Sequence, residues 1–277
     1  MSRLGTRSAV AFALLFAAPA RGAPQDGAPK EVAPGAQESD DDRAALATLA
    51  TSVARGKLGG ATARELDDYL KDFPDSPLAL LLHAEVRRRT GRYEEAAADV
   101  DHARRGCNEP ALRRAFAVGA FELHFELGDS AACAADLDFG LDGTDPADDA
   151  ALPLHARRLL LLLDLGKKKE ANELYAVRFK DARKEAPPRV ALEYGRALTA
   201  LRDLDRAAQI LVPVEKSLRD ARAPDQVDAL VLLARLYRWT RAQGDMIPAL
   251  QAANDALEID PQSIPMLVER ARTHLLH

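Results

Sequence analysis

The chain has 277 residues, of which 47% are hydrophobic and only 5% aromatic, and its formal net charge is −5. This composition is that of a folded protein, and the negative charge argues against a partner that is a nucleic acid. Alanine and leucine supply most of the apolar side chains, and both favour helices over strands. The composition therefore predicts an all-α protein.

Residues 1–22 have the pattern of a secretory signal peptide. Arg3 and Arg7 give a positive start, an apolar run follows over residues 9–18, and small residues at 18–20 offer a cleavage site. An uncleaved membrane anchor is the less favoured alternative, because the run is about half as long as the roughly 20 residues that span a bilayer. We expect a periplasmic or secreted protein with no stable membrane insertion. Cleavage would remove three arginines and no acidic residue, leaving a net charge of −8.

Residues 23–42 are predicted to be a disordered linker. They are rich in Pro, Gly, Ala, Gln and acidic side chains and contain almost no large apolar residue, so they cannot bury enough surface to order themselves. From residue 43 to residue 277 helical periodicity is nearly continuous and is broken only by short turn signals. This second range is predicted to form one helical domain.

A repeated turn organises the helical domain. Gly91 can adopt the left-handed conformation that ends a helix, while Ala84 and Ala96 on either side are small enough to let two helices approach closely. The register recurs with turn positions at Gly91, Gly128, Gly166, Arg202 and Gly244, each followed five residues later by Ala96, Cys133, Ala171, Ala207 and Ala249. Each helix pair has an apolar face that it cannot bury alone, so we expect the pairs to stack.

This pattern resembles the tetratricopeptide repeat (TPR) family, whose unit is a helix-turn-helix of about 34 residues. The resemblance is strongest over residues 80–103 and 233–261, and the second stretch ends in Ala-Leu-Glu-Ile-Asp-Pro. Between them the repeats are longer and Arg202 replaces the turn glycine. The resemblance implies a right-handed α-solenoid of about six TPR-like hairpins over residues 43–277, closed by a C-terminal capping helix over residues 264–276.

No catalytic or metal-binding motif has the spacing that its chemistry requires. The sequence contains no His-Glu-x-x-His, Gly-x-Ser-x-Gly or Cys-x-x-Cys, and no histidine stands at ligand spacing from both a carboxylate and a cysteine. We therefore predict no enzymatic activity, no metal and no cofactor. Cys107 and Cys133 fall at opposite ends of neighbouring helices in the repeat register, about 15 Å apart, whereas a disulfide needs Cα atoms within about 7 Å. We expect no disulfide.

A group of arginines is the main candidate for a partner-binding site. The first helices of successive TPR hairpins line a concave groove, and the register places four arginines outward on it: Arg196, Arg235, Arg238 and Arg241. The last three step by three residues and form one slanting stripe on a helix. Guanidinium groups bind carboxylates bidentately, so an acidic protein or peptide would suit them. The alternative is a solvated face with local ion pairs, for example to Asp228.

The sequence thus predicts a non-catalytic, exported scaffold that binds a protein or peptide in the concave groove. Two other roles stay open, namely an assembly subunit of a cell-envelope enzyme complex and a self-assembling structural protein. The lone tryptophan, Trp239, is expected to pack between hairpins, with a role as an aromatic anchor for the partner as the alternative.

Overall fold

The computed structural model describes residues 38–54, 60–145, 148–179, 187–221, 226–240, 246–259, 261 and 264–276. The predicted signal peptide, most of the predicted linker and Arg241 lie outside these ranges. Within them every regular element is a helix, which confirms the all-α prediction. None of the described helices is both long and apolar enough to cross a membrane.

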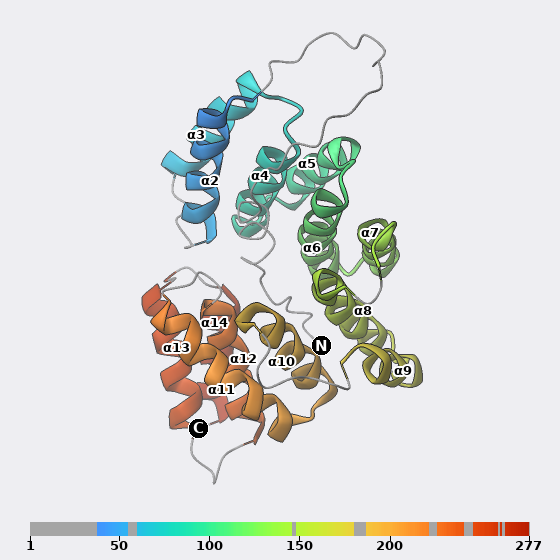
Figure 1. The fold of residues 1–277 in the computed structure, drawn as a ribbon. Coiled ribbons are helices and arrows are strands. Elements are labelled where there is room, and N and C mark those ends of the chain that lie inside the picture. The colour runs from blue at the N-terminus through green and yellow to red at the C-terminus, as the bar shows by residue number, and fades with distance from the viewer. Residues whose placement is uncertain are drawn as a thin grey trace.

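Helices follow one another in pairs along the sequence, and one further helix ends the described part (Figure 1). The pairs are α2 (Asp40–Ala54) with α3 (Gly60–Asp72), α4 (Pro77–Arg89) with α5 (Tyr93–Gly106), α6 (Pro110–Leu127) with α7 (Ser130–Leu141), α8 (Leu152–Asp164) with α9 (Lys168–Arg178), α10 (Pro188–Leu201) with α11 (Leu204–Asp220), and α12 (Gln226–Thr240) with α13 (Ile247–Ile259). The last helix is α14 (Ile264–Leu276), and a short 3-10 turn, η1 (Asp149–Ala151), precedes α8.

The first helices of the pairs form a row that positions the candidate site. Helices α4, α6, α8, α10, α12 and α14 each contact the next member of the row. Helices α5, α7 and α9 lie on the outer side of α4, α6 and α8, and the row curves toward α10 and α12 (Figure 1). The arrangement is a solenoid, as predicted. We call the inner side of the row, away from α5, α7 and α9, the concave face.

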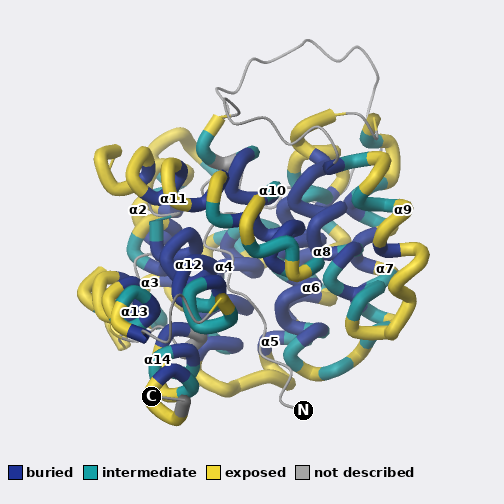
Figure 2. Tube along the Cα trace, turned by 90° about the horizontal axis from the view of Figure 1, so that it is seen from below, coloured by how far each residue is buried: buried dark blue, intermediate teal, exposed yellow. Residues whose placement is uncertain are grey.

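Burial follows the same division between inner and outer helices. In Figure 2 the helices of the row, such as α6, α8 and α12, are mostly dark blue, whereas α7 and α9 carry much exposed yellow surface. In α12 every residue from Val227 to Ala234 is buried, while in α9 the only buried residue is Ala171. The first helices are thus covered on several sides, and the second helices bury only the stripe that faces their partner.

The turns between paired helices share one backbone conformation. Gly91, Gly128 and Gly166 have positive φ angles of 80°, 75° and 74°, and Arg202 has a φ of 64°. Each is followed five residues later by a small side chain with no exposed surface: Ala96, Cys133, Ala171 and Ala207. Such small side chains let the second helix lie close to the first. The repeat register predicted from the sequence is therefore correct at these turns, while Gly244 lies outside the described residues.

The last pair needs a correction to that register. Counting back from Gly244 assigns the helix-contact position of α12 to Tyr237, which is only half buried, whereas Ala234 is 1% exposed. The long step to the last turn therefore reflects extra residues between α12 and α13. In α10 the equivalent position is Gly195, where an added Cβ would lie 2.3 Å from a methyl group of Leu211 on α11, so the approach of these helices requires glycine.

Helix α2 begins inside the range assigned to the linker. The backbone N–H of Ser39 donates to the Asp42 carboxylate at 2.9 Å, and the backbone N–H of Asp42 donates to the Ser39 hydroxyl at 3.2 Å. This reciprocal pair is a capping box, and the three aspartates of the first turn also face the positive end of the helix dipole. Acidic residues that suggest a linker in the sequence thus start a helix.

Both cysteines are buried and free. Burial raises the pKa of Cys107 to about 11 and that of Cys133 to about 12. A thiol that stays protonated at neutral pH is a poor nucleophile, so these side chains fill the core rather than supply chemistry.

A hydrogen bond between a histidine of α6 and an aspartate of α7 predicts that the stability of the fold depends on pH. His124 Nδ1 lies 2.6 Å from an Asp136 carboxylate oxygen. This hydrogen bond raises the pKa of His124, against the effect of burial and with help from Asp129 and Asp101. A raised folded-state pKa stabilises the fold fully below the unfolded value of about 6.5, and this contribution is lost as the pH rises through the folded value. Between about pH 6 and pH 8, urea unfolding should therefore show a larger loss of stability for wild type than for His124→Gln, and equal losses would contradict the assignment.

Candidate functional site

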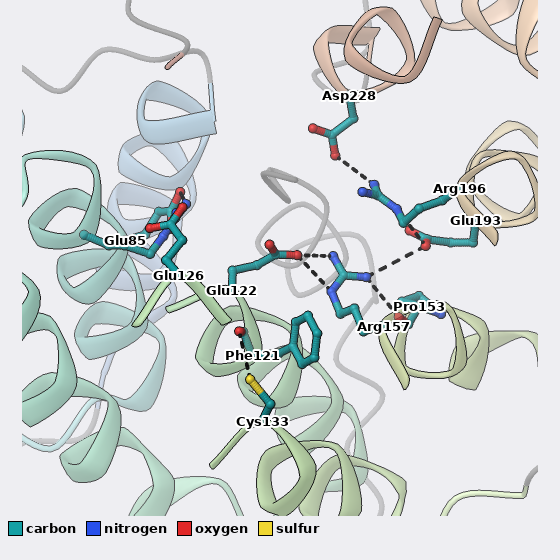
Figure 3. A network of polar contacts seen from close by, with 11 residues as sticks. Glu85, Phe121, Glu122, Glu126, Cys133, Pro153, Arg157, Glu193, Arg196 and Asp228 are labelled. Carbon is teal, nitrogen blue, oxygen red and sulfur yellow. Dashed lines mark hydrogen bonds and ion pairs between the residues drawn. The ribbon is translucent and has the colours of Figure 1, made fainter. Parts of the chain in front are cut away.

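Ion pairs join successive first helices of the row. An arginine on one helix pairs with a carboxylate on the next: Arg88 with Glu126, Arg157 with Glu193, Arg196 with Asp228, and Arg235 with Glu269. The two partners are 38, 36, 32 and 34 residues apart in the sequence, which is about one repeat. We call this set the ion ladder, and Figure 3 shows its central part. It places alternating charges between helices that the repeat brings side by side.

Arg157 on α8 is the centre of the ion ladder. Its guanidinium lies 3.0 Å from Glu122 of α6 and 3.8 Å from Glu193 of α10, and it also donates to the Pro153 carbonyl at 2.9 Å (Figure 3). All three charged side chains are buried. Burial raises the pKa of Glu122, and the neighbouring arginines oppose that effect. Removing one member of the ladder would leave another buried charge without its partner, and this is strongly destabilising.

The structure places two of the four predicted site arginines, Arg196 and Arg235, in the ion ladder, and a third, Arg238, on the ladder carboxylate Glu269. Arg196 lies 3.1 Å from Glu193 and 3.3 Å from Asp228, and it is buried. Arg235 and Arg238 both pair with Glu269 of α14, at 3.2 and 2.8 Å, and their side chains are only 15% and 12% exposed. These three side chains thus already hold carboxylates of the protein itself, which differs from the solvent-facing stripe expected from the sequence. Their binding to a partner stays a prediction, as does that of Arg241.

A hollow of about 270 Å³ lies between α6, α8, α10 and α12. Its apolar lining includes Phe125, Leu160, Leu163, Leu232 and Trp239. Its charged lining is Arg196, Arg202, Arg235 and Asp164. Arg196 is paired with Glu193 and Asp228, and Arg235 is paired with Glu269, so their charges are already balanced. The hollow therefore combines an apolar wall with three guanidinium groups, of which Arg202 alone has no ion pair to a described carboxylate.

Arg202 and Trp239 form the most distinctive contact in the lining. The guanidinium carbon of Arg202 lies 3.3 Å from the centre of the Trp239 ring, and those of Arg235 and Arg238 lie 5.9 and 5.8 Å away. Burial and the charge of Arg238 lower the pKa of Arg202. Burial also lowers the pKa of Arg235, although Glu269 opposes it. Burial is the largest cause of both shifts, and the charge of Arg238 is a smaller one.

Sequence reasoning did not find this contact. It treated Arg202 only as a departure from the turn glycine. It placed Trp239 between hairpins, where the contact with Arg202 of the preceding pair lies, but it did not predict the hollow that Trp239 lines. The available signal was the turn position itself, because an arginine there must adopt a conformation that the other turns leave to glycine.

The part of the sequence that the structure describes contains no group of three or more His, Cys, Asp or Glu side chains that could hold a metal ion. Among the charged groups lining the hollow, arginine cannot serve as a general base because it stays protonated in proteins. The hydroxyl of Thr199, which also lines the hollow, donates to the Gly195 carbonyl at 2.7 Å.

No protein-family model and no curated protein matches the sequence. Among solved structures, this protein is similar to one described as pilF of Pseudomonas aeruginosa, with 18% identity, a TM-score of 0.46 and coverage of 84% of this chain and 98% of that one. It is also similar to the APC/C hetero-tetramer Cut9-Hcn1, with 15% identity and a TM-score of 0.46 over 82% of this chain and 42% of that one. A tetratricopeptide repeat protein from Parabacteroides merdae matches with 16% identity and a TM-score of 0.40, over 85% of this chain and 100% of that one. The turns, helix pairs and packing described above give this protein a TPR-like solenoid fold.

Proposed function

We propose that this protein is a non-catalytic scaffold that binds a segment of a partner protein in the hollow between α6, α8, α10 and α12. The observation that carries the proposal is the combination of an apolar wall and arginine side chains in that hollow. A binding site for a peptide needs apolar surface for affinity and a few placed polar groups for orientation. Arg202, which forms no ion pair with a described carboxylate, favours a partner segment that is acidic.

We also propose that the scaffold acts outside the cytoplasm. The proposal is supported by the positive start, the apolar run and the small residues at 18–20 of the sequence. The intact mass of the protein recovered from envelope and medium fractions tests it. A polypeptide that begins between residues 21 and 24 is the expected result, and a full-length polypeptide confined to the cytoplasm would count against export.

Site-specific photo-crosslinking tests where the partner binds. A photoreactive residue in place of Leu163, which is half buried in the lining of the hollow, should capture the partner. The same residue in place of Val177, which is 70% exposed on the outer helix α9, is the matched control and should not. Trp239→Ala should then reduce capture at position 163 by about tenfold or more, because aromatic anchors carry much of the binding energy of such sites.

Two outcomes of the crosslinking experiment would contradict binding in the hollow. Equal capture from positions 163 and 177 would place the partner elsewhere on the surface. Capture at position 163 that does not respond to Trp239→Ala would show that the hollow itself is not the binding site. Circular dichroism of each variant confirms that the helices are retained.

A further inference from the structure

We propose that Arg202 recognises a carboxylate of the bound segment, and that an apolar side chain next to this carboxylate lies against Leu160 and Leu163. The inference rests on the proposed function and names the chemistry of the ligand. The carboxylate can belong to an Asp or Glu side chain or to the C-terminus of the segment. A peptide library with free and with amidated C-termini separates these two sources.

The backbone at Arg202 is the first reason. Among the described residues Arg202 is the only non-glycine with a positive φ angle, and the equivalent turns use Gly91, Gly128 and Gly166. The left-handed conformation is unfavourable for an L-residue other than glycine. The turn by itself is thus best served by glycine. A residue kept in an unfavourable conformation indicates a use for its side chain, and such positions are concentrated at binding sites.

The state of the guanidinium is the second reason. Arg202 lies over the ring of Trp239 at 3.3 Å, which holds the planar group in place and lowers the entropy lost when a ligand binds. Within the described ranges no carboxylate forms an ion pair with Arg202, whereas Arg196, Arg235 and Arg238 each have at least one. Arg202 is therefore the arginine of the hollow that no described carboxylate holds.

Charge complementarity is the third reason. Arg196, Arg235 and Arg238 lie near Arg202 but are paired with carboxylates of the protein, so the guanidinium of Arg202 is the group that an anion entering the hollow would meet. The half-buried Leu160 and Leu163 lie in the same lining and offer contact for one apolar side chain. A segment with an acidic group beside Leu, Ile, Met or Phe satisfies both surfaces.

Trp239 provides the first test, because it is the single tryptophan of the protein and its emission reports on the hollow. Relative to the quenching of free N-acetyltryptophanamide by the same ions, iodide should quench this emission more strongly than caesium, since an anion is attracted to Arg202 and a cation is repelled. Arg202→Gln should reduce the difference, and Arg206→Gln, at an exposed arginine four residues further on, should leave it unchanged. Equal quenching by the two ions in wild type, or an unchanged difference in Arg202→Gln, would overturn the inference.

Selection from a random peptide library provides the second test, with one arm of amidated peptides and one arm of peptides with a free C-terminus. Wild type should select an acidic residue, or in the second arm the C-terminus itself, beside an apolar residue. Arg202→Gly should bind the selected peptides about tenfold more weakly, the loss expected for one charge-assisted hydrogen-bonding group. Its Tm should be no lower than that of wild type, because glycine relieves the turn.

The outcomes separate this inference from the proposed function. If the selected peptides quench or shift Trp239 emission but show no preference for acidic residues, binding in the hollow is supported and the role of Arg202 is overturned. Peptides that bind wild type and Arg202→Gly equally would do the same. A lower Tm with equal losses for acidic and neutral peptides would make Arg202 a structural residue. Selection of no peptide at all would count against both proposals.

Discussion

Arg157→Met should lower the free energy of unfolding by about 3–5 kcal/mol, the usual cost of removing one partner of a buried ion pair. Arg157 is the central member of the ion ladder, and its loss leaves Glu122 and Glu193 buried without their shared countercharge. The burial that already raises the pKa of Glu122 would then act with less opposition. Urea unfolding followed by circular dichroism measures the effect.

Two further variants isolate the cause of that loss. Arg158→Met changes the neighbouring residue on the same helix, whose pair with Asp138 is much more exposed, and should cost less than about 1 kcal/mol. Combining Arg157→Met with Glu122→Gln and Glu193→Gln should recover much of the lost stability, because no uncompensated charge remains. If Arg157→Met costs no more than Arg158→Met, the ion ladder does not stabilise the solenoid.

Glu269→Gln should release α14 from α12, with a loss of about 3 kcal/mol that is confined to this end of the solenoid. Glu269 is 1% exposed and accepts hydrogen bonds from Arg235 at 3.2 Å, from Arg238 at 2.8 Å and from Arg272 at 3.4 Å. Neutralising this carboxylate leaves three guanidinium groups without their shared acceptor charge. Hydrogen exchange should rise in α14 and stay low in α6.

The matched control for Glu269→Gln is Glu258→Gln, at an exposed position on α13. It should change neither the stability nor the exchange of α14, and equal effects of the two variants would contradict the role of Glu269. The variant Glu269→Gln also tests the predicted arginine stripe, since it frees Arg235 and Arg238 from their carboxylate. Acidic peptides should bind Glu269→Gln more tightly than wild type if these arginines contact the partner, and equally if they do not.

The repeat architecture could be predicted from the sequence because its requirements are local. A left-handed turn needs glycine, and a close helix contact needs a small side chain at a set distance from that turn. Gly91 with Ala96 and Gly128 with Cys133 meet both requirements within a few residues, and the structure follows them. The same reasoning failed for Tyr237, because the residues added between α12 and α13 changed the spacing on which it depends.

Local sequence patterns were enough to predict the helix pairs, the turn positions at the glycines and at Arg202, and the presence of arginines along the first helices. What those arginines do depends on the packing of helices that are distant in the sequence. Their carboxylate partners lie about one repeat away in the sequence, as Glu269 does from Arg235. A local sequence pattern does not show which faces of two helices pack against each other. The placement of Arg202 over Trp239 has the same origin, since it joins a turn to a helix of the next pair. Side chains from separate helices meet only once stacking has set the rotation of each helix, and that rotation separates an arginine held by its own protein from one that is open to a partner.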